Sequence, residues 1–201
     1  MSKVDENKRR KKDAITDSAF SLFIQKGINA TSIADIMQKA HLAKGTFYLY
    51  FKDKYEVRDY LVRKKAAQVF EKAQIALEQS NVKEFEEKIL FLVDHILNQL
   101  NANKLLLRFI SKNLSWGIFR NAIMNMQMDE HSPNAEEFIE RLFEESGKQY
   151  RNSEMLIFMI IELVNSTAHS VILYKQPVEL NELKESLYPI IRQMIRSFEI
   201  E

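Results

Sequence analysis

Hydrogen-bond donors are concentrated in the segment from residue 44 to residue 54. Ammonium, hydroxyl and phenol groups are supplied there by Lys44, Thr46, Tyr48, Tyr50 and Lys54. Such groups donate to phosphate oxygens and to other acceptors on a nucleic acid. The chemistry that this segment offers is therefore binding to a polyanion.

Catalytic signatures are absent from the sequence. There is no Gly-rich phosphate loop, no Gly-x-Ser-x-Gly motif and no cysteine, which also excludes disulfides. The four histidines show no metal-ligand spacing; they are His41, His95, His131 and His169. We therefore expect that the protein is not an enzyme and that it has no metal site and no cofactor. We expect His95 and His169 to be core residues.

Short helices are expected to position the donors. Apolar residues at Ile15, Ala19 and Phe23 predict one face of a helix that ends at Gly27. A basic run, residues 8–12, leads into this helix. It could contact phosphates or form a solvated helix start, and both readings stay open.

Two short helices follow, joined by a turn at 41–42. The hydroxyl pair at 31–32 can cap the first, and Asp35 completes a motif that resembles a capping box. The second spans 44–50, and a long helix over 54–79 comes next. In such a helix-turn-helix, one helix crosses the DNA backbone and the next presents its N-terminal residues to base edges.

Charge is unevenly divided along the chain. Residues 1–65 hold 15 Lys and Arg against 8 Asp and Glu, a net charge of +7, and the remaining residues hold 14 against 20, a net charge of −6. A basic first part is expected where one end of a chain meets a polyanion. An ordinary solvated charge run would show the same asymmetry.

The segment 27–54, GINATSIADIMQKAHLAKGTFYLYFKDK, resembles the DNA-binding signature of TetR-type (tetracycline-repressor-like) bacterial regulators. The most specific part is Lys-Gly-Thr-Phe-Tyr-x-Tyr-Phe-x-x-Lys, residues 44–54, and the resemblance covers about residues 8–60. Two positions depart from the common pattern. His41 stands where the turn usually has Gly, and Ala43 stands where Ser or Thr often caps the reading helix.

The resemblance implies a role for each matching residue. Phosphate contacts are implied for Thr31 and Lys54, and backbone or sugar contacts for Tyr48 and Tyr50. Base-facing positions are Lys44, Gly45, Thr46 and Leu49. Phe47 and Phe51 would be core residues, and either tyrosine could instead be a core aromatic.

Apolar periodicity predicts further helices after residue 80, over 85–100, 105–110, 116–128, 135–145, 151–174 and 180–198. The helix over 151–174 is apolar nearly all round, so it needs partners on more than one side. Paired with their symmetry mates, the last two helices would form a four-helix dimer interface. Alternatively, they complete the core of the monomer.

The resemblance also implies a helical C-terminal domain that often binds a small effector. Bulky candidates for such a pocket are Phe70, Phe91, His95, Phe109, Trp116, Phe119, Met124 and Met128. Thioether side chains adapt to varied apolar shapes and would suit a hydrophobic or cationic ligand. Residues of these types are more often plain core.

We therefore expect an all-α chain, with a three-helix DNA-binding domain at 1–54 joined by the long helix to a dimerisation and ligand domain at 55–201. Four Gly and three Pro are too few for a strand-and-turn fold. The strongly apolar stretch 155–164 is interrupted by Glu162 and is too short to cross a bilayer, and no signal peptide is visible. A cytoplasmic location and no membrane partner are expected.

The expected function is that of a dimeric repressor, released from a palindromic operator on double-stranded DNA by a small, largely apolar effector. The alternative is a helix-turn-helix regulator whose C-terminal domain binds a protein partner and no small ligand.

Overall fold

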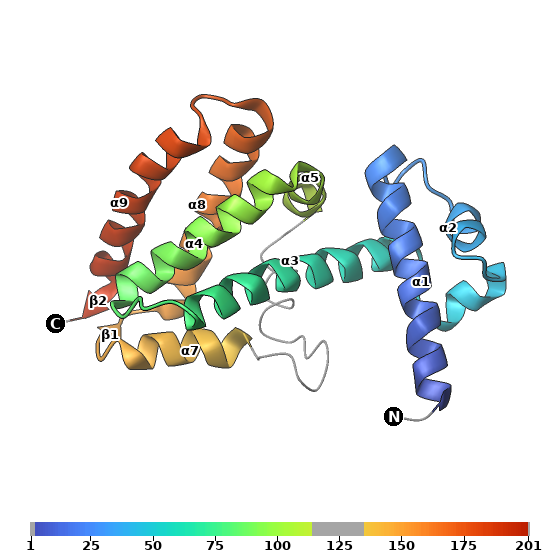
Figure 1. The fold of residues 1–201 in the computed structure, drawn as a ribbon, viewed down its shortest axis with the longest axis horizontal. Coiled ribbons are helices and arrows are strands. Elements are labelled where there is room, and N and C mark those ends of the chain that lie inside the picture. Colours follow the sequence, from blue (N-terminus) through green and yellow to red (C-terminus); the bar gives the residue numbers. More distant parts are fainter. Residues whose placement is uncertain (1–2, 114–134, 201) are drawn as a thin grey trace. The chain divides into compact units, whose positions relative to one another are not determined.

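The computed structural model describes residues 3–113 and 135–200, and nearly all of its regular structure is helical (Figure 1). This confirms the expected all-α class. The chain divides into two compact units, Met1–Arg63 and Lys64–Glu201, and the division falls within α3 (Lys54–Glu78). The domain boundary expected from the sequence, after residue 54, lies at the first residue of this helix. The helix expected over 116–128 lies outside the described residues.

The first unit contains α1 (Lys3–Lys26), α2 (Ile33–Lys39), the 3-10 helix η1 (Lys44–Leu49) and the start of α3. These segments bury Ile15, Ala19, Phe23, Ile36, Met37, Phe47, Phe51, Val57 and Leu61. The basic run lies inside α1 rather than before it, because residues 3–12 contain no Gly or Pro and are rich in good helix formers.

The start of α2 is capped as the sequence predicted. The Ser32 hydroxyl accepts from the Asp35 backbone N–H at 3.1 Å, and the Asp35 carboxylate accepts from the Ser32 backbone N–H at 2.9 Å. Lys26, in the last turn of α1, donates to the same carboxylate at 2.7 Å. One carboxylate therefore caps α2 and also connects it to α1.

The turn after α2 has the hydrogen bonds of a Schellman motif. The Leu42 N–H donates to the Met37 carbonyl at 3.0 Å, and the His41 N–H donates to the Gln38 carbonyl at 3.2 Å. His41 has a φ of 55°, in the left-handed region. A histidine at the position that usually holds Gly therefore keeps the turn, with a strain of about 1 kcal/mol.

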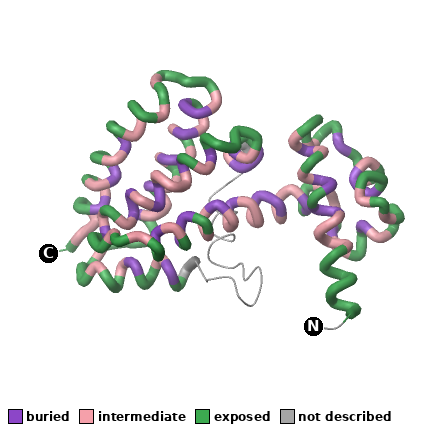
Figure 2. Tube along the Cα trace, in the orientation of Figure 1, coloured by how far each residue is buried: buried purple, intermediate pink, exposed green. Residues whose placement is uncertain are grey.

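The second unit is organised around α4 (Phe85–Ala102). This helix contacts α5 (Lys104–Asn113), α7 (Ala135–Glu145), α8 (Ser153–Tyr174) and α9 (Leu180–Phe198). Within this unit α8 and α9 lie side by side, and the buried residues of these helices face inward (Figures 1 and 2). The core is largely aliphatic, and it extends along α4 from Phe85 to Leu100.

Charged pairs join α9 to α4 at the surface of this core. Arg192 donates to Glu87 at 2.8 Å, and Arg196 donates to Glu86 at 2.9 Å. The hydrogen bond from Arg196 lowers the pKa of Glu86. These bonds therefore connect α9 to the first turn of α4 at the surface of the unit.

Two short strands were not expected from the sequence. β1 (Gln149–Tyr150) pairs antiparallel with β2 (Glu199–Ile200) and joins the start of α8 to the end of α9. Two residues are too few to show the alternating pattern by which a strand is recognised.

The length of α8 also corrects an expectation. The apolar stretch continues beyond residue 164 to Tyr174, so the whole helix is long and apolar enough to cross a bilayer by length and composition. The core helix of a soluble protein meets the same criterion. Only a third of its apolar window is buried within this chain, so α8 leaves apolar surface for a partner.

We predict that Lys26→Met raises the pKa of Asp35. The hydrogen bond from Lys26, followed by those from Ser32, lowers this pKa from 3.8 to about 2. Because the folded-state pKa is depressed, the contribution of Asp35 to stability is complete above about pH 4 and is lost as the pH falls toward 2. An NMR titration of the carboxyl carbon should give a value nearer 3.8 in the variant.

Lys39→Met is the matched control, because Lys39 is an exposed lysine in the last turn of α2. It should leave the pKa of Asp35 unchanged. An unaltered pKa in Lys26→Met would contradict the assignment of the ion pair.

Candidate nucleic-acid interface

The 3-10 helix η1, which contains the residues expected to face DNA bases, is anchored to the first unit by one aromatic side chain. Phe47 is fully buried, its ring lies 6.1 Å from that of Phe51, and Phe51 lies 5.6 Å from Tyr60 of α3. This confirms that both phenylalanines are core residues. The rest of η1 can therefore face away from the unit.

The residues around Phe47 are open to solvent. Tyr48 is 58% exposed and Leu49 is 76% exposed, and Lys44 and Gly45 are exposed as well. Tyr48 is therefore not a core aromatic. Thr46 and Tyr50 are half-buried. The base-facing and sugar-facing residues implied by the resemblance thus lie on one short element with its apolar anchor beneath them.

Gly45 has space around it that the fold does not use. A Cβ atom built on Gly45 meets no other atom within 4 Å, and the backbone of Gly45 does not lie in the left-handed region. Ala43, before η1, makes no side-chain cap, as its lack of a hydroxyl predicts. Glycine is therefore not required here for the internal packing of the unit.

The two residues expected to bind phosphate have internal partners. Thr31 is 1% exposed, and its hydroxyl donates to the Gly27 carbonyl at 2.7 Å. The Lys54 ammonium donates to the carbonyls of Ile28, Asn29 and Thr31 at 2.9, 3.2 and 2.9 Å. An ammonium has three donors, so the turn between α1 and α2 can occupy all of them.

Lys54 is thus placed to hold the turn over residues 28–31. This role could not be predicted from the sequence, because a lysine that follows an aromatic pair shows the same pattern whether its ammonium faces a phosphate or a carbonyl. A phosphate contact by Lys54 or Thr31 remains a prediction, and the geometry of the free protein does not favour it.

The basic run on α1 is mostly at the surface. Lys8, Arg9 and Arg10 are exposed, whereas Lys11 and Lys12 are half-buried. The Lys12 ammonium lies 4.2 Å from the centroid of the Tyr60 ring, within the range of a cation–π contact. The first three of these residues are therefore the ones available to a polyanion.

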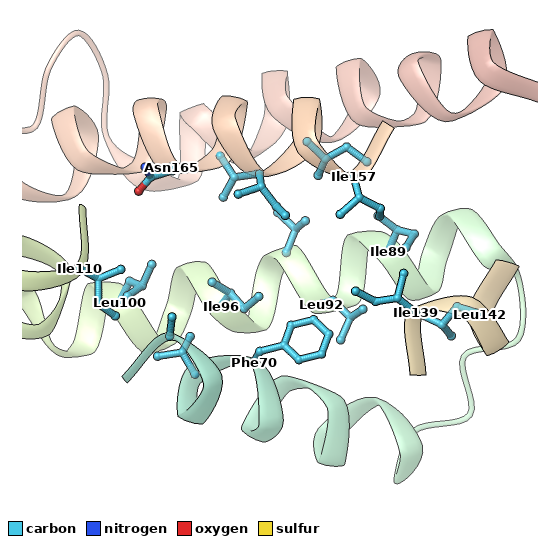
Figure 3. Close-up of a pocket in the computed structure, with 16 residues that line it drawn as sticks. Phe70, Ile89, Leu92, Ile96, Leu100, Ile110, Ile139, Leu142, Ile157 and Asn165 are labelled. Atoms are coloured by element: carbon cyan, nitrogen blue, oxygen red, sulfur yellow. The ribbon is translucent and has the colours of Figure 1, made fainter. Parts of the chain in front are cut away.

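A cavity of about 150 Å³ lies inside the second unit (Figure 3). The described residues of its lining are aliphatic except for one phenylalanine and one asparagine: Ala66, Val69, Phe70, Ile89, Leu92, Val93, Ile96, Leu100, Ile110, Ile139, Leu142, Ile157, Ile160, Ile161, Val164 and Asn165. Of the expected pocket residues, Phe70 lines this cavity. Trp116, Phe119, Met124 and Met128 lie outside the described residues.

Phe91, His95 and Phe109 are not among the lining residues. Phe91 and His95 stack on each other, with ring centroids 6.2 Å apart, and they occupy a different stripe of α4 from Ile89, Leu92 and Ile96. Selecting aromatic and sulfur-containing residues therefore missed a cavity walled by β-branched and leucine side chains. The usable signal was Asn165, a polar residue that directly follows the apolar stretch 155–164.

Comparison with known proteins gives matches to the first unit. Residues 15–61 match the family model described as bacterial regulatory proteins, tetR family. The HTH-type transcriptional regulator YuxN of Bacillus subtilis is 41% identical over 46 residues, which are 23% of this chain and 16% of that protein. YvdT of the same organism is 46% identical over 44 residues, 22% of this chain and 23% of that protein. The chain therefore spans less than a quarter of either relative.

Solved structures match nearly the whole chain in fold. A TetR-family regulator from Shewanella sp. PV-4 has a TM-score of 0.68 at 18% identity, covering 95% of this chain and 99% of that one. The fatty acid degradation regulator FadR from Bacillus halodurans has a TM-score of 0.63 at 20% identity, covering 90% and 94%. Residues 15–61 therefore resemble the DNA-binding segment of the tetR family of bacterial regulatory proteins, and the chain as a whole shares its fold with solved TetR-family regulators.

Proposed function

We propose that this protein is a dimeric DNA-binding repressor, released from a palindromic operator by a small, largely apolar effector. The observation that carries the DNA-binding part is η1, a short helix anchored by buried Phe47. Around that anchor it exposes Lys44, Gly45, Tyr48 and Leu49. These side chains are accessible to a partner molecule and place donors beside an apolar contact surface.

The exposed groups of η1 suit a major groove. Lysine and threonine can donate to or accept from base edges, and apolar side chains such as leucine can contact the methyl group of thymine. Residues 1–63 carry 13 Lys and Arg against 8 Asp and Glu, a net charge of +5, which favours approach to a polyanion. Lys54 and Thr31 serve this interface by shaping the turn before α2.

Exposed apolar side chains on α8 and α9 support dimerisation. Met155, Met159, Tyr174 and Ile190 are between 40% and 61% exposed. A two-fold axis through this surface would cover each side chain with its counterpart and produce a four-helix interface. Two reading segments would then contact two half-sites of a palindrome.

The cavity supports the effector part of the proposal. Its lining residues are almost all apolar, so a ligand of matching shape gains free energy by removing these walls from water. The cavity also favours an effector over a protein partner. Ala66, Val69 and Phe70 of its lining belong to α3, whose first residues belong to the reading unit, so a ligand touches a helix that both units share.

Gly45→Ala provides the sharpest test of the interface. The added methyl group meets open space within the protein, so stability should stay the same or rise slightly. Against a fitted DNA surface the same methyl group is overpacked, and affinity should fall about tenfold. A gel-shift titration with the DNA upstream of the gene measures this affinity.

Ser21→Ala, on an exposed position of α1, is the control for Gly45→Ala and should change neither stability nor affinity. If the wild-type chain showed no specific binding to the upstream fragment, the proposed function would be wrong. If Gly45→Ala bound as tightly as the wild type, η1 would not be the closest point of approach.

For Lys54→Met we expect a loss of stability in the absence of DNA. Hydrogen bonds from a charged group contribute about 1.5–3 kcal/mol, so urea unfolding should show a decrease of about 2 kcal/mol. Lys52→Met, at an exposed neighbouring lysine, should show none. A phosphate ligand at position 54 would instead leave stability intact and reduce the salt slope of DNA binding by about 1.

Met159→Asp is expected to weaken the dimer. Two carboxylates brought together across a two-fold axis repel each other and lose the apolar contact, so the dimer dissociation constant should rise by at least about tenfold. Sedimentation velocity would report the change, with Ile75→Asp on exposed α3 surface as the control. If the dimer dissociation constant were unchanged in Met159→Asp, the proposed dimer interface on α8 would be wrong.

A further inference from the structure

We infer that the cavity of the second unit selects an uncharged ligand, with a small apolar body and one polar group that hydrogen-bonds to Asn165. This inference deepens the proposed function, because it names the chemical class of the effector. It stands on the cavity itself, whose walls are shown in Figure 3.

The walls offer nothing to balance a charge. Among the described lining residues there is no lysine, arginine, histidine, aspartate or glutamate. A carboxylate or an ammonium group buried there would lose its hydration without gaining a counter-ion, and that penalty exceeds what a short apolar tail recovers. Anionic and cationic ligands are therefore disfavoured by the same walls.

Within residues 3–113 and 135–200, Asn165 is the one polar side chain that lines the cavity. It is half-buried on α8, next to Val164 and one turn from Ile161, which both face the cavity. Its side-chain amide makes no hydrogen bond to the described part of the chain. A carboxamide both donates and accepts, so it complements a hydroxyl, carbonyl or amide group of a neutral ligand. An unpaired amide at an apolar wall favours a ligand that supplies such a group.

The position of Asn165 gives the ligand a direction. In Figure 3 Asn165 lies toward the end of the cavity that holds Ile110, whereas Ile139 and Leu142 lie toward the other end. The polar group of the ligand is therefore expected near α5, with the apolar body extending along α4. A cavity of about 150 Å³ has room for a molecule of benzene-like size or slightly larger.

Three probes with the same six-carbon chain test the selection by charge. Hexan-1-ol, hexanoate and hexylammonium differ in their head group, and at pH 7 the last two are ionised. Calorimetric titration of the full-length dimer without DNA should show binding of hexan-1-ol, and binding at least about tenfold weaker for each ion.

Two variants test the hydrogen bond. Asn165→Leu keeps the branched shape and the number of heavy atoms of the side chain but removes the amide, so the affinity of this variant for hexan-1-ol should fall about tenfold. Asn101→Leu, on exposed surface of α4 outside the cavity, should bind like the wild type. Thermal unfolding checks that the variants fold. Asn165→Ser offers a hydroxyl in place of the amide, so its affinity for hexan-1-ol should lie between those of the wild type and Asn165→Leu.

The inference is overturned if hexanoate or hexylammonium binds as tightly as hexan-1-ol. It is also overturned if Asn165→Leu and Asn165→Ser leave the affinity unchanged, or if none of the probes binds at millimolar concentration. A gel shift with hexan-1-ol separates this inference from the proposed function. Binding of the alcohol that leaves the DNA complex intact would refute release by an effector and leave the ligand class standing.

Discussion

A six-residue 3-10 helix has too few hydrogen bonds to persist alone in water, so η1 takes its shape from the burial of Phe47. With that ring inside, Tyr48 and Leu49 on the same element are held outward. The burial of Phe47 that stabilises η1 therefore also causes the exposure of these two apolar side chains. Every contact proposed for DNA depends on this one anchored aromatic.

Polar groups around the anchor set the angles at which the chain enters and leaves the two short helices. Asp35 caps α2 and pairs with Lys26 of α1, and Lys54 collects three carbonyls of the preceding turn. After α2, His41 adopts a left-handed conformation within a Schellman motif. Short-range hydrogen bonds thus do the positioning that such small elements cannot achieve by packing alone.

The second unit is stabilised mainly by packing of its aliphatic core, in contrast to the short-range hydrogen bonds of the first unit. Its interior is aliphatic around α4, and its ion pairs lie at the surface, where Arg192 and Arg196 of α9 contact Glu86 and Glu87. Close packing is interrupted by a cavity where Asn165 is the only polar side chain among the lining residues that the structure describes. Specificity for a ligand can therefore come from shape and a single hydrogen bond, with charge excluded by the walls.

Local patterns in the sequence determined the all-α class and the capping box at Ser32, because caps and helix periodicity depend on neighbouring residues, and the family resemblance implied the core role of Phe47. Only the tertiary structure decided what Lys54 and Asn165 face. The partners of Lys54 lie more than twenty residues earlier in the chain, and the cavity beside Asn165 is bounded by five helices. Such surroundings arise from packing between segments that are distant in the sequence. A local sequence pattern therefore cannot predict which residues these two side chains contact.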